Sequence, residues 1–184
     1  MYRTLRAISA IILFLALGSA QSQSFGSTKT LSLVPPAGFS GPLSASPGEG
    51  AETHAYSRDR PEGQPRTLLQ ITKFDSGDRL KNLSESERHA LTRRYLSEFL
   101  KGIERRRTNY KQSEPTDLVL GGEPAARAEW SGSIGGIEAH GVMYAVIVGP
   151  VVYQLHTQDS VSAPEVDMQN AIRSIESLEF KSHG

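Results

Sequence analysis

The chain has 184 residues, carries 20 lysines and arginines against 20 aspartates and glutamates, and contains no cysteine. This length fits one globular domain, and the lack of cysteine excludes a disulfide scaffold, a cysteine–metal site and a cysteine nucleophile. The balanced charge argues against a basic nucleic-acid-binding protein.

The first twenty residues have the features of a secretory signal peptide. Arg3 and Arg6 precede residues 7–17, which are apolar except for one serine, and the small residues 18–20 follow. The apolar run is about half as long as a membrane-spanning helix of roughly 20 residues. We therefore predict cleavage after Ala20, with an uncleaved anchor as the alternative. The mature protein would be secreted or periplasmic, without a transmembrane helix after cleavage of the signal peptide.

The mature chain is predicted to contain a flexible segment, residues 21–29, and a single domain, residues 30–181, because no linker is long enough to divide it. Three segments in its first half have the alternation or composition of β-strands, at 30–34, 52–58 and 66–74. Residues 36–50 contain three prolines and four glycines and are predicted to form a loop.

The longest predicted element is a helix over residues 84–107. Ser84 and Glu87 have the spacing of a capping box, in which each side chain binds a free backbone N–H group. Apolar residues recur at helical spacing along one face, and a basic run, 105–107, stands at the C-terminus, where positive charge is favourable. This run could bind an anion or a lipid headgroup. The alternative, which we favour, is an ordinary solvated helix face.

The second half of the domain is predicted to be mostly strands, after a polar link that follows Tyr110. These strands are expected at 117–120, 125–133, 137–148 and 151–158, with an edge strand at 179–181. A helix is predicted to precede the edge strand, since Ser162 and Glu165 repeat the capping-box spacing at its start.

A two-residue turn at Gly135-Gly136 would fix the pairing of the two longest strands. Trp130 would then lie opposite Gly141, so that the indole fills the space left by the missing side chain. The face with Trp130 is apolar, and the opposite face becomes apolar beyond His140. Because a strand that is apolar on both faces is covered on both sides, we predict an antiparallel sheet with one helix on each face.

The face of this hairpin opposite to Trp130 contains the best candidate site. We take four residues on it as candidate binding residues: Glu129, Glu138, His140 and Tyr144. Glu129, Glu138 and His140 could form a metal or acid–base site if the three groups converge. A solvated sheet edge is the favoured alternative, because the spacings of metal-binding motifs are absent. No catalytic residue, metal ion or cofactor is therefore predicted.

The order of elements and several short motifs resemble a known fold. Pro36-Ala37-Gly38-Phe39 follows the leading strand, Gly121-Gly122 ends a later one, and Tyr144 and Tyr153 lie in a three-strand meander before the closing helix. This pattern resembles the PsbP-like fold, a compact α/β/α sandwich, and within it the exported bacterial proteins of the LpqN/DcrB group. The resemblance implies an α+β domain with accessory or binding roles rather than catalysis.

One expectation and one alternative for function follow. We expect an exported, non-enzymatic binding or accessory protein of the cell envelope, whose partner is an unknown protein, lipid or envelope component and not a nucleic acid. The binding surface would be the groove between a helix and the sheet, or segment 36–50. The alternative is a metal-dependent or acid–base hydrolase that uses His140 with Glu129 or Glu138.

Overall fold

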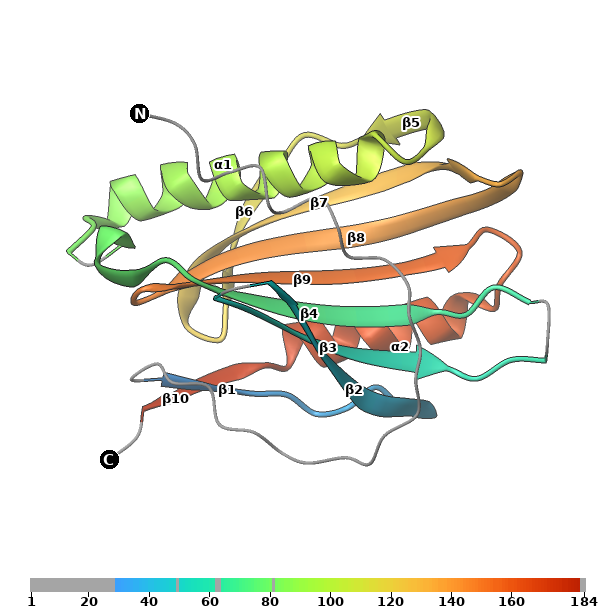
Figure 1. Ribbon diagram of the computed structural model, residues 1–184, viewed down its shortest axis with the longest axis horizontal. Helices are drawn as coiled ribbons and strands as arrows, with labels where there is room; N and C mark the ends of the chain where they lie inside the picture. Colours follow the sequence, from blue (N-terminus) through green and yellow to red (C-terminus); the bar gives the residue numbers. More distant parts are fainter. Residues whose placement is uncertain (1–28, 49, 62–63, 81, 183–184) are drawn as a thin grey trace.

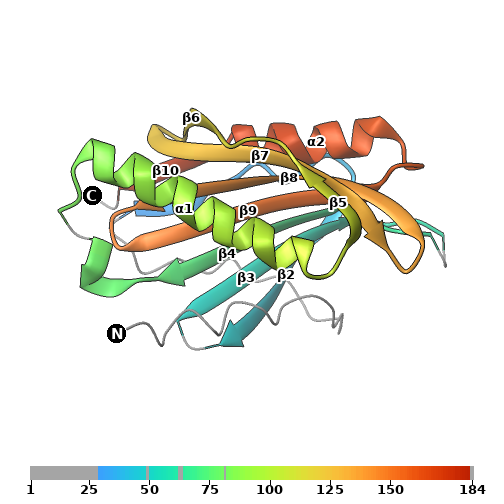
Figure 2. The same cartoon turned by 90° about the horizontal axis from the view of Figure 1, so that it is seen from above.

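The computed structural model describes residues 29–182 except 49, 62–63 and 81, so the predicted signal peptide and residues 21–28 of the predicted flexible segment lie outside the described residues. An antiparallel sheet forms the middle layer of the molecule. Helix α1 (Glu85–Glu104) covers one of its faces and helix α2 (Glu165–Glu176) covers the other (Figures 1 and 2). This arrangement confirms the predicted α+β sandwich.

The described residues form a large sheet in the order β2-β3-β4-β9-β8-β7-β5, with β6 also paired to β7. The strands are β2 (Phe39–Gly48), β3 (Ala51–Arg58), β4 (Leu68–Asp75), β5 (Thr108–Gln112), β6 (Thr116–Leu120), β7 (Glu123–Ile134), β8 (Ile137–Val148) and β9 (Val151–Ser160). Two further strands, β1 (Lys29–Ser32) and β10 (Glu179–Ser182), pair with each other, and a 3₁₀ helix, η1 (Gly77–Leu80), precedes α1. In the part of the chain that the structure describes, no helix is long and apolar enough to cross a membrane.

The two faces of the sheet bury two separate hydrophobic clusters. On one face, Tyr144 belongs to a cluster with Ile175 of α2. On the other face, Met143 belongs to a cluster with Leu96 of α1. Neighbouring residues of β8 thus serve different clusters, and residues 141–148 are all buried. The double-sided apolar pattern of this strand is the reason that the sheet needs a helix on each side.

The pairing of β7 with β8 confirms the predicted hairpin register. Ile134 lies opposite Ile137, and Trp130 lies opposite Gly141. The indole occupies the space above the glycine, because a Cβ atom built on Gly141 would lie 2.5 Å from the Trp130 ring and 2.6 Å from the carbonyl oxygen of Thr157. Trp130 is only 3% exposed. The glycine is therefore required by the close approach of the indole.

The prediction of a loop at 36–50 was wrong, because most of this segment forms strand β2. The strand pairs with β3, with Leu43 opposite Ala55. Its register is interrupted at two places, and each interruption contains a proline, Pro42 or Pro47. A proline is tolerated at a bulge or on an edge strand, where no ladder N–H group is needed. Proline content therefore misled the prediction here.

Other boundaries also differ from the predicted ones. The expected polar link after Tyr110 includes the end of β5, whose Gln112 lies opposite Trp130. Most of β5 is solvent-exposed, so its sequence has no apolar alternation to reveal it. Helix α1 ends at Glu104 rather than at Arg107, and β1 begins at Lys29, the last residue of the predicted flexible segment.

Of the two predicted capping boxes, the structure contains only the first. The Ser84 side chain accepts a hydrogen bond from the Glu87 N–H group, and the Glu87 carboxylate accepts one from the Ser84 N–H group. The second prediction was wrong, because α2 begins after Pro164, which makes no side-chain cap. The pyrrolidine of Pro164 and the polar turn before it leave Ser162 outside the helix.

Replacing Ser84 with alanine is expected to lower the free energy of unfolding by about 1 kcal/mol, because the first turn of α1 loses its capping acceptor. Ser162→Ala is the matched control, since the Ser162 hydroxyl contacts the Ser160 hydroxyl and caps no helix. Chemical denaturation of both variants measures the difference. Equal losses for the two variants would contradict this role of Ser84.

A histidine is buried beside the indole. The Nε1–H group of Trp130 donates a hydrogen bond to Nε2 of His156 at 3.2 Å. Burial, and secondarily the positive charge of Arg107, lowers the pKa of His156 to about 3. The folded protein therefore keeps this imidazole neutral, with its proton on Nδ1.

The buried histidine predicts a loss of stability in acid. An unfolded chain binds a proton at His156 below about pH 6.5, whereas the folded protein does not until about pH 3. The contribution of His156 is present above pH 6.5 and is lost progressively as the pH falls toward 3, by up to about 1.4 kcal/mol per pH unit. His156→Gln should flatten this part of the pH dependence. Denaturation curves at about pH 7 and about pH 5 test it, and an unchanged slope would refute it.

Candidate functional site

A groove of about 590 Å³ lies between helix α2 and strands β7 and β8. Its lining comes from the two strands, from the end of β9, from the turn after β9 and from one side of the helix. The lining residues used below are Arg127, Glu129, His140, Val142, Asp159, Glu165, Met168, Gln169, Ile172 and Glu176. This is the groove between a helix and the sheet that the sequence suggested as a binding surface.

The groove combines apolar side chains with charged walls. Val142 and Met168 belong to the core on this face, and Ile172 packs against it, so these residues supply apolar surface. Carboxylates of the lining outnumber the single arginine, Arg127. Such a combination suits a ligand that has an apolar part and a positive charge.

Arg127 and Tyr144 organise one end of the groove. The Arg127 guanidinium donates to Glu129 at 2.8 Å and to the Tyr144 hydroxyl at 3.2 Å. The Tyr144 hydroxyl in turn donates to the Glu176 carboxylate of α2 at 3.0 Å. Burial raises the pKa of Tyr144 to about 12, so the phenol stays protonated and continues to donate to Glu176. The chain of contacts ties α2 to the sheet at this end.

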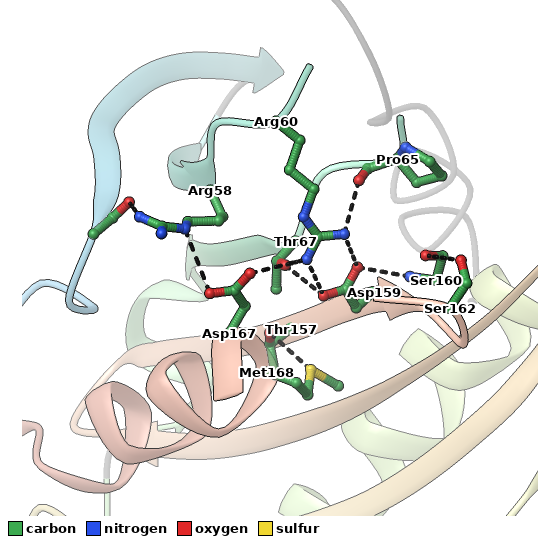
Figure 3. Close-up of polar contacts among 11 residues, drawn as sticks. Arg58, Arg60, Pro65, Thr67, Thr157, Asp159, Ser160, Ser162, Asp167 and Met168 are labelled. Atoms are coloured by element: carbon green, nitrogen blue, oxygen red, sulfur yellow. Dashed lines mark hydrogen bonds and ion pairs between the residues drawn. The ribbon is translucent and has the colours of Figure 1, made fainter. Parts of the chain in front are cut away.

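Three charged side chains contact one another at the other end of the groove, where Asp159 is part of the lining, and Figure 3 shows their contacts. Arg60, from the segment after β3, donates to both oxygens of Asp159 on β9, at 3.1 and 2.9 Å, and to Asp167 of α2 at 3.1 Å. The side chains of Arg60 and Asp159 are 9% and 1% exposed. Thr67 also donates to Asp159, and Arg58 lies 3.4 Å from Asp167. We call Arg58, Arg60, Asp159 and Asp167 the ion cluster.

The ion cluster balances two arginines against two aspartates, and all of these side chains except that of Arg58 are largely buried. Burial alone disfavours the charged guanidinium of Arg60, but hydrogen bonds and charges from Asp159 and Asp167 outweigh this and raise the pKa of Arg60. Asp167 also lies in the first turn of α2, where a negative charge is favourable. The cluster thus links the start of α2 to the end of β9.

The structure places two of the four predicted binding residues on the groove surface, Glu129 and His140. Tyr144 is fully buried and reaches the groove only through its contacts with Arg127 and Glu176. Glu138 shares the strand face with His140 but is not part of the lining. Among the described residues, no three histidine, aspartate or glutamate side chains are close enough to hold a metal ion.

Neither the helix wall of the groove nor the ion cluster was predicted from the sequence. Gln169 and Glu176 resemble the other polar residues on the exposed side of α2. Arg60 and Asp159 are 99 residues apart, and Arg60 lies between the predicted strands 52–58 and 66–74. The one available signal was Asp159, a carboxylate at the end of an otherwise buried strand, because such a charge needs a partner.

Comparison with known proteins supports the fold. No family model and no curated protein matches the chain. LpqN of Mycobacterium tuberculosis, which is involved in cell envelope biogenesis, superposes with a TM-score of 0.54 and 15% identity over 83% of this chain and 84% of LpqN. PA94 of Pseudomonas aeruginosa, a protein of unknown function, superposes with a TM-score of 0.50 and 10% identity over 68% of this chain and 80% of PA94.

The PsbP protein of Synechocystis sp. PCC 6803 is also similar, with a TM-score of 0.45 and 10% identity over 89% of this chain and 98% of that one. The likeness to LpqN confirms the predicted resemblance at the level of the fold. The antiparallel sheet and the two covering helices thus follow the sandwich that the order of elements and the short motifs indicated.

Proposed function

We propose that this protein is an exported, non-enzymatic binding protein of the cell envelope, and that the groove beside α2 holds a basic segment of a partner protein. The groove itself is the observation that carries the proposal, because it joins apolar surface to an excess of carboxylates. The involvement of LpqN in cell envelope biogenesis supports the envelope location. The charged start and apolar run of residues 1–20 support export.

The charges of the groove favour a positively charged ligand. Arg127 is paired with Glu129, and Asp159 is paired with Arg60, so these charges largely cancel. Within the described part of the chain, Glu165 and Glu176 have no such ion pair. Their negative charge would repel anionic lipid headgroups and attract lysine or arginine side chains. A protein segment with alternating basic and apolar residues matches both properties of the groove.

Binding of synthetic peptides tests this proposal. A peptide of alternating lysine and leucine should bind, and a peptide of alternating glutamate and leucine should not, as measured by isothermal titration calorimetry. The affinity should decrease with added salt, because part of it comes from charge attraction. Absence of binding by the basic peptide, or equal binding of both peptides, would refute the proposal.

A matched pair of variants on α2 tests whether binding occurs in the groove. Gln169→Trp adds bulk at a residue that lines the groove, and Val166→Trp adds the same bulk at an exposed residue outside it. We expect Gln169→Trp to weaken peptide binding at least about tenfold, equivalent to about 1.4 kcal/mol. Val166→Trp should bind as the unmodified protein does. Equal affinities for the two variants would place the binding elsewhere.

A further inference from the structure

We infer that the opposite side of the sheet carries a second site, in which Arg107, held over Trp130, and Gln158 bind an oxyanion, either a carboxylate or a phosphate group. Arg107 lies in the connection between α1 and β5, and Trp130 belongs to the hydrophobic cluster beneath α1. Arg107 and Gln158 are not part of the groove lining, although Trp130 contributes to both. It does not depend on the proposed binding of a basic segment in the groove.

The guanidinium of Arg107 is fixed in place by neutral groups. Its Cζ atom lies 5.1 Å from the centre of the Trp130 ring, which is a favourable cation–π distance. Nη2 donates to the side-chain oxygen of Gln158 at 3.1 Å, and Nη1 donates to the backbone carbonyl of Arg106 at 3.3 Å. The Nε atom is buried and has no hydrogen-bond partner. One donor of the guanidinium fork is thus unused, although an unpaired buried donor is costly.

The charge of Arg107 is not balanced as the charges of comparable arginines are. Arg60 and Arg127 are also partly buried, but each donates to carboxylates. Arg107 has no ion pair with any described carboxylate. Burial, followed by the positive charge of Arg106, lowers the pKa of Arg107. Hydrogen bonds to Asp159 and Asp167 raise the pKa of Arg60, and hydrogen bonds to Tyr144 and Glu129 raise that of Arg127. The backbone carbonyls at the end of α1 offset part of the charge but supply no full negative charge.

A side-chain amide next to Arg107 supplies a further hydrogen-bond donor. The side-chain oxygen of Gln158 accepts from Arg107, so its amide N–H₂ group remains available as a donor. His156 lies against Trp130 and is neutral, so it neither repels nor replaces the arginine charge. A planar arginine fork beside an amide donor fits the geometry of carboxylate and phosphate oxygens.

The indole beneath Arg107 provides a direct measurement, because Trp130 is the only tryptophan of the chain. Titration of the intact protein with sodium phosphate, and separately with sodium acetate, should change the tryptophan fluorescence in a saturable way. Sodium chloride at equal ionic strength should not. Vesicles of phosphatidylcholine with and without phosphatidic acid then distinguish a lipid phosphate from a free one. A fluorescence change with the vesicles that contain phosphatidic acid, but not with the others, would indicate a lipid phosphate.

Substitutions at Arg107 test whether the fluorescence change arises from binding at this arginine. Arg107→Gln should weaken the fluorescence response at least about tenfold, and Arg107→Lys should weaken it less, because lysine keeps the charge but not the fork. Arg94→Gln is the matched control, an exposed arginine on α1 outside the site. If Arg107→Gln does not fold, thermal denaturation of the unmodified protein with and without phosphate tests the same binding.

Three results would overturn the inference. The first is the absence of a saturable change in tryptophan fluorescence up to about 10 mM of either anion. This concentration is ten times a Kd of about 1 mM and would nearly saturate such a site. The second is a change that chloride reproduces at equal ionic strength. The third is a response that Arg107→Gln retains in full. Any of these results would mean that Arg107 only supports the packing of Trp130.

Discussion

Replacing Trp130 with alanine is expected to lower the free energy of unfolding by about 3–5 kcal/mol, the usual cost of deleting a buried aromatic side chain. The indole is 3% exposed, stacks on Tyr110 with ring centres 6.4 Å apart, and fills the space above Gly141. Its removal would leave a cavity and would also remove the donor that binds His156. Chemical denaturation followed by circular dichroism measures the loss without needing tryptophan fluorescence.

A second substitution tests the same contact from its other side. Gly141→Ala should also destabilise the protein, because the new methyl group would lie 2.5 Å from the indole and 2.6 Å from the Thr157 carbonyl oxygen. Gly136→Ala is not a suitable control, since Gly136 has a positive φ of 82°. Gly48→Ala is suitable, because no atom lies within 4 Å of the added methyl group. A loss for Trp130→Ala below about 1 kcal/mol would contradict the packing described here.

Replacing Arg60 with methionine is expected to cost about 3–5 kcal/mol, because it would leave Asp159 and Asp167 as buried carboxylates without their common partner. Methionine preserves most of the length and apolar volume of arginine, so the effect reports the lost charge and hydrogen bonds. Thermal or chemical denaturation at neutral pH measures the change in the free energy of unfolding.

The matched control for this variant is Arg93→Met. Arg93 also binds a carboxylate through two hydrogen bonds, both 2.6 Å, to Asp117, but this pair is on the surface. Water screens an exposed pair, so its removal should change stability far less. The triple variant with Arg60→Met, Asp159→Asn and Asp167→Asn should recover part of the loss, since no buried charge remains. Equal effects of Arg60→Met and Arg93→Met would refute the structural role of the ion cluster.

The central part of the fold could be predicted because several local signals agreed. The turn at Gly135-Gly136 set the register, and that register put apolar residues on both faces of residues 141–148. The capping box at Ser84 marked the start of α1. Each of these signals depends on residues that are close in the sequence, which is why sequence periodicity was sufficient.

Other parts could not be predicted, because tertiary contacts decide them. Strand β5 is mostly exposed, so only its pairing with β7 makes it a strand. The ion cluster joins Arg60 to partners 99 and 107 residues away, a distance over which no spacing rule operates. The candidate site was predicted only in part, because one of its two walls depends on long-range contacts. The hairpin register placed Glu129 and His140 on one face, whereas the helix that forms the other wall packs there through long-range contacts.

Strand β2 has a consequence for the behaviour of the protein in concentrated solution. Among the described residues it is the outermost strand of the sheet at that side, so its outer edge could template the addition of a strand from another molecule. Pro42 and Pro47 offer no N–H group for such a ladder, and the two breaks in register bend the strand out of line. The same prolines that led the sequence to predict a loop are thus expected to hinder the stacking of strands from other molecules on this edge.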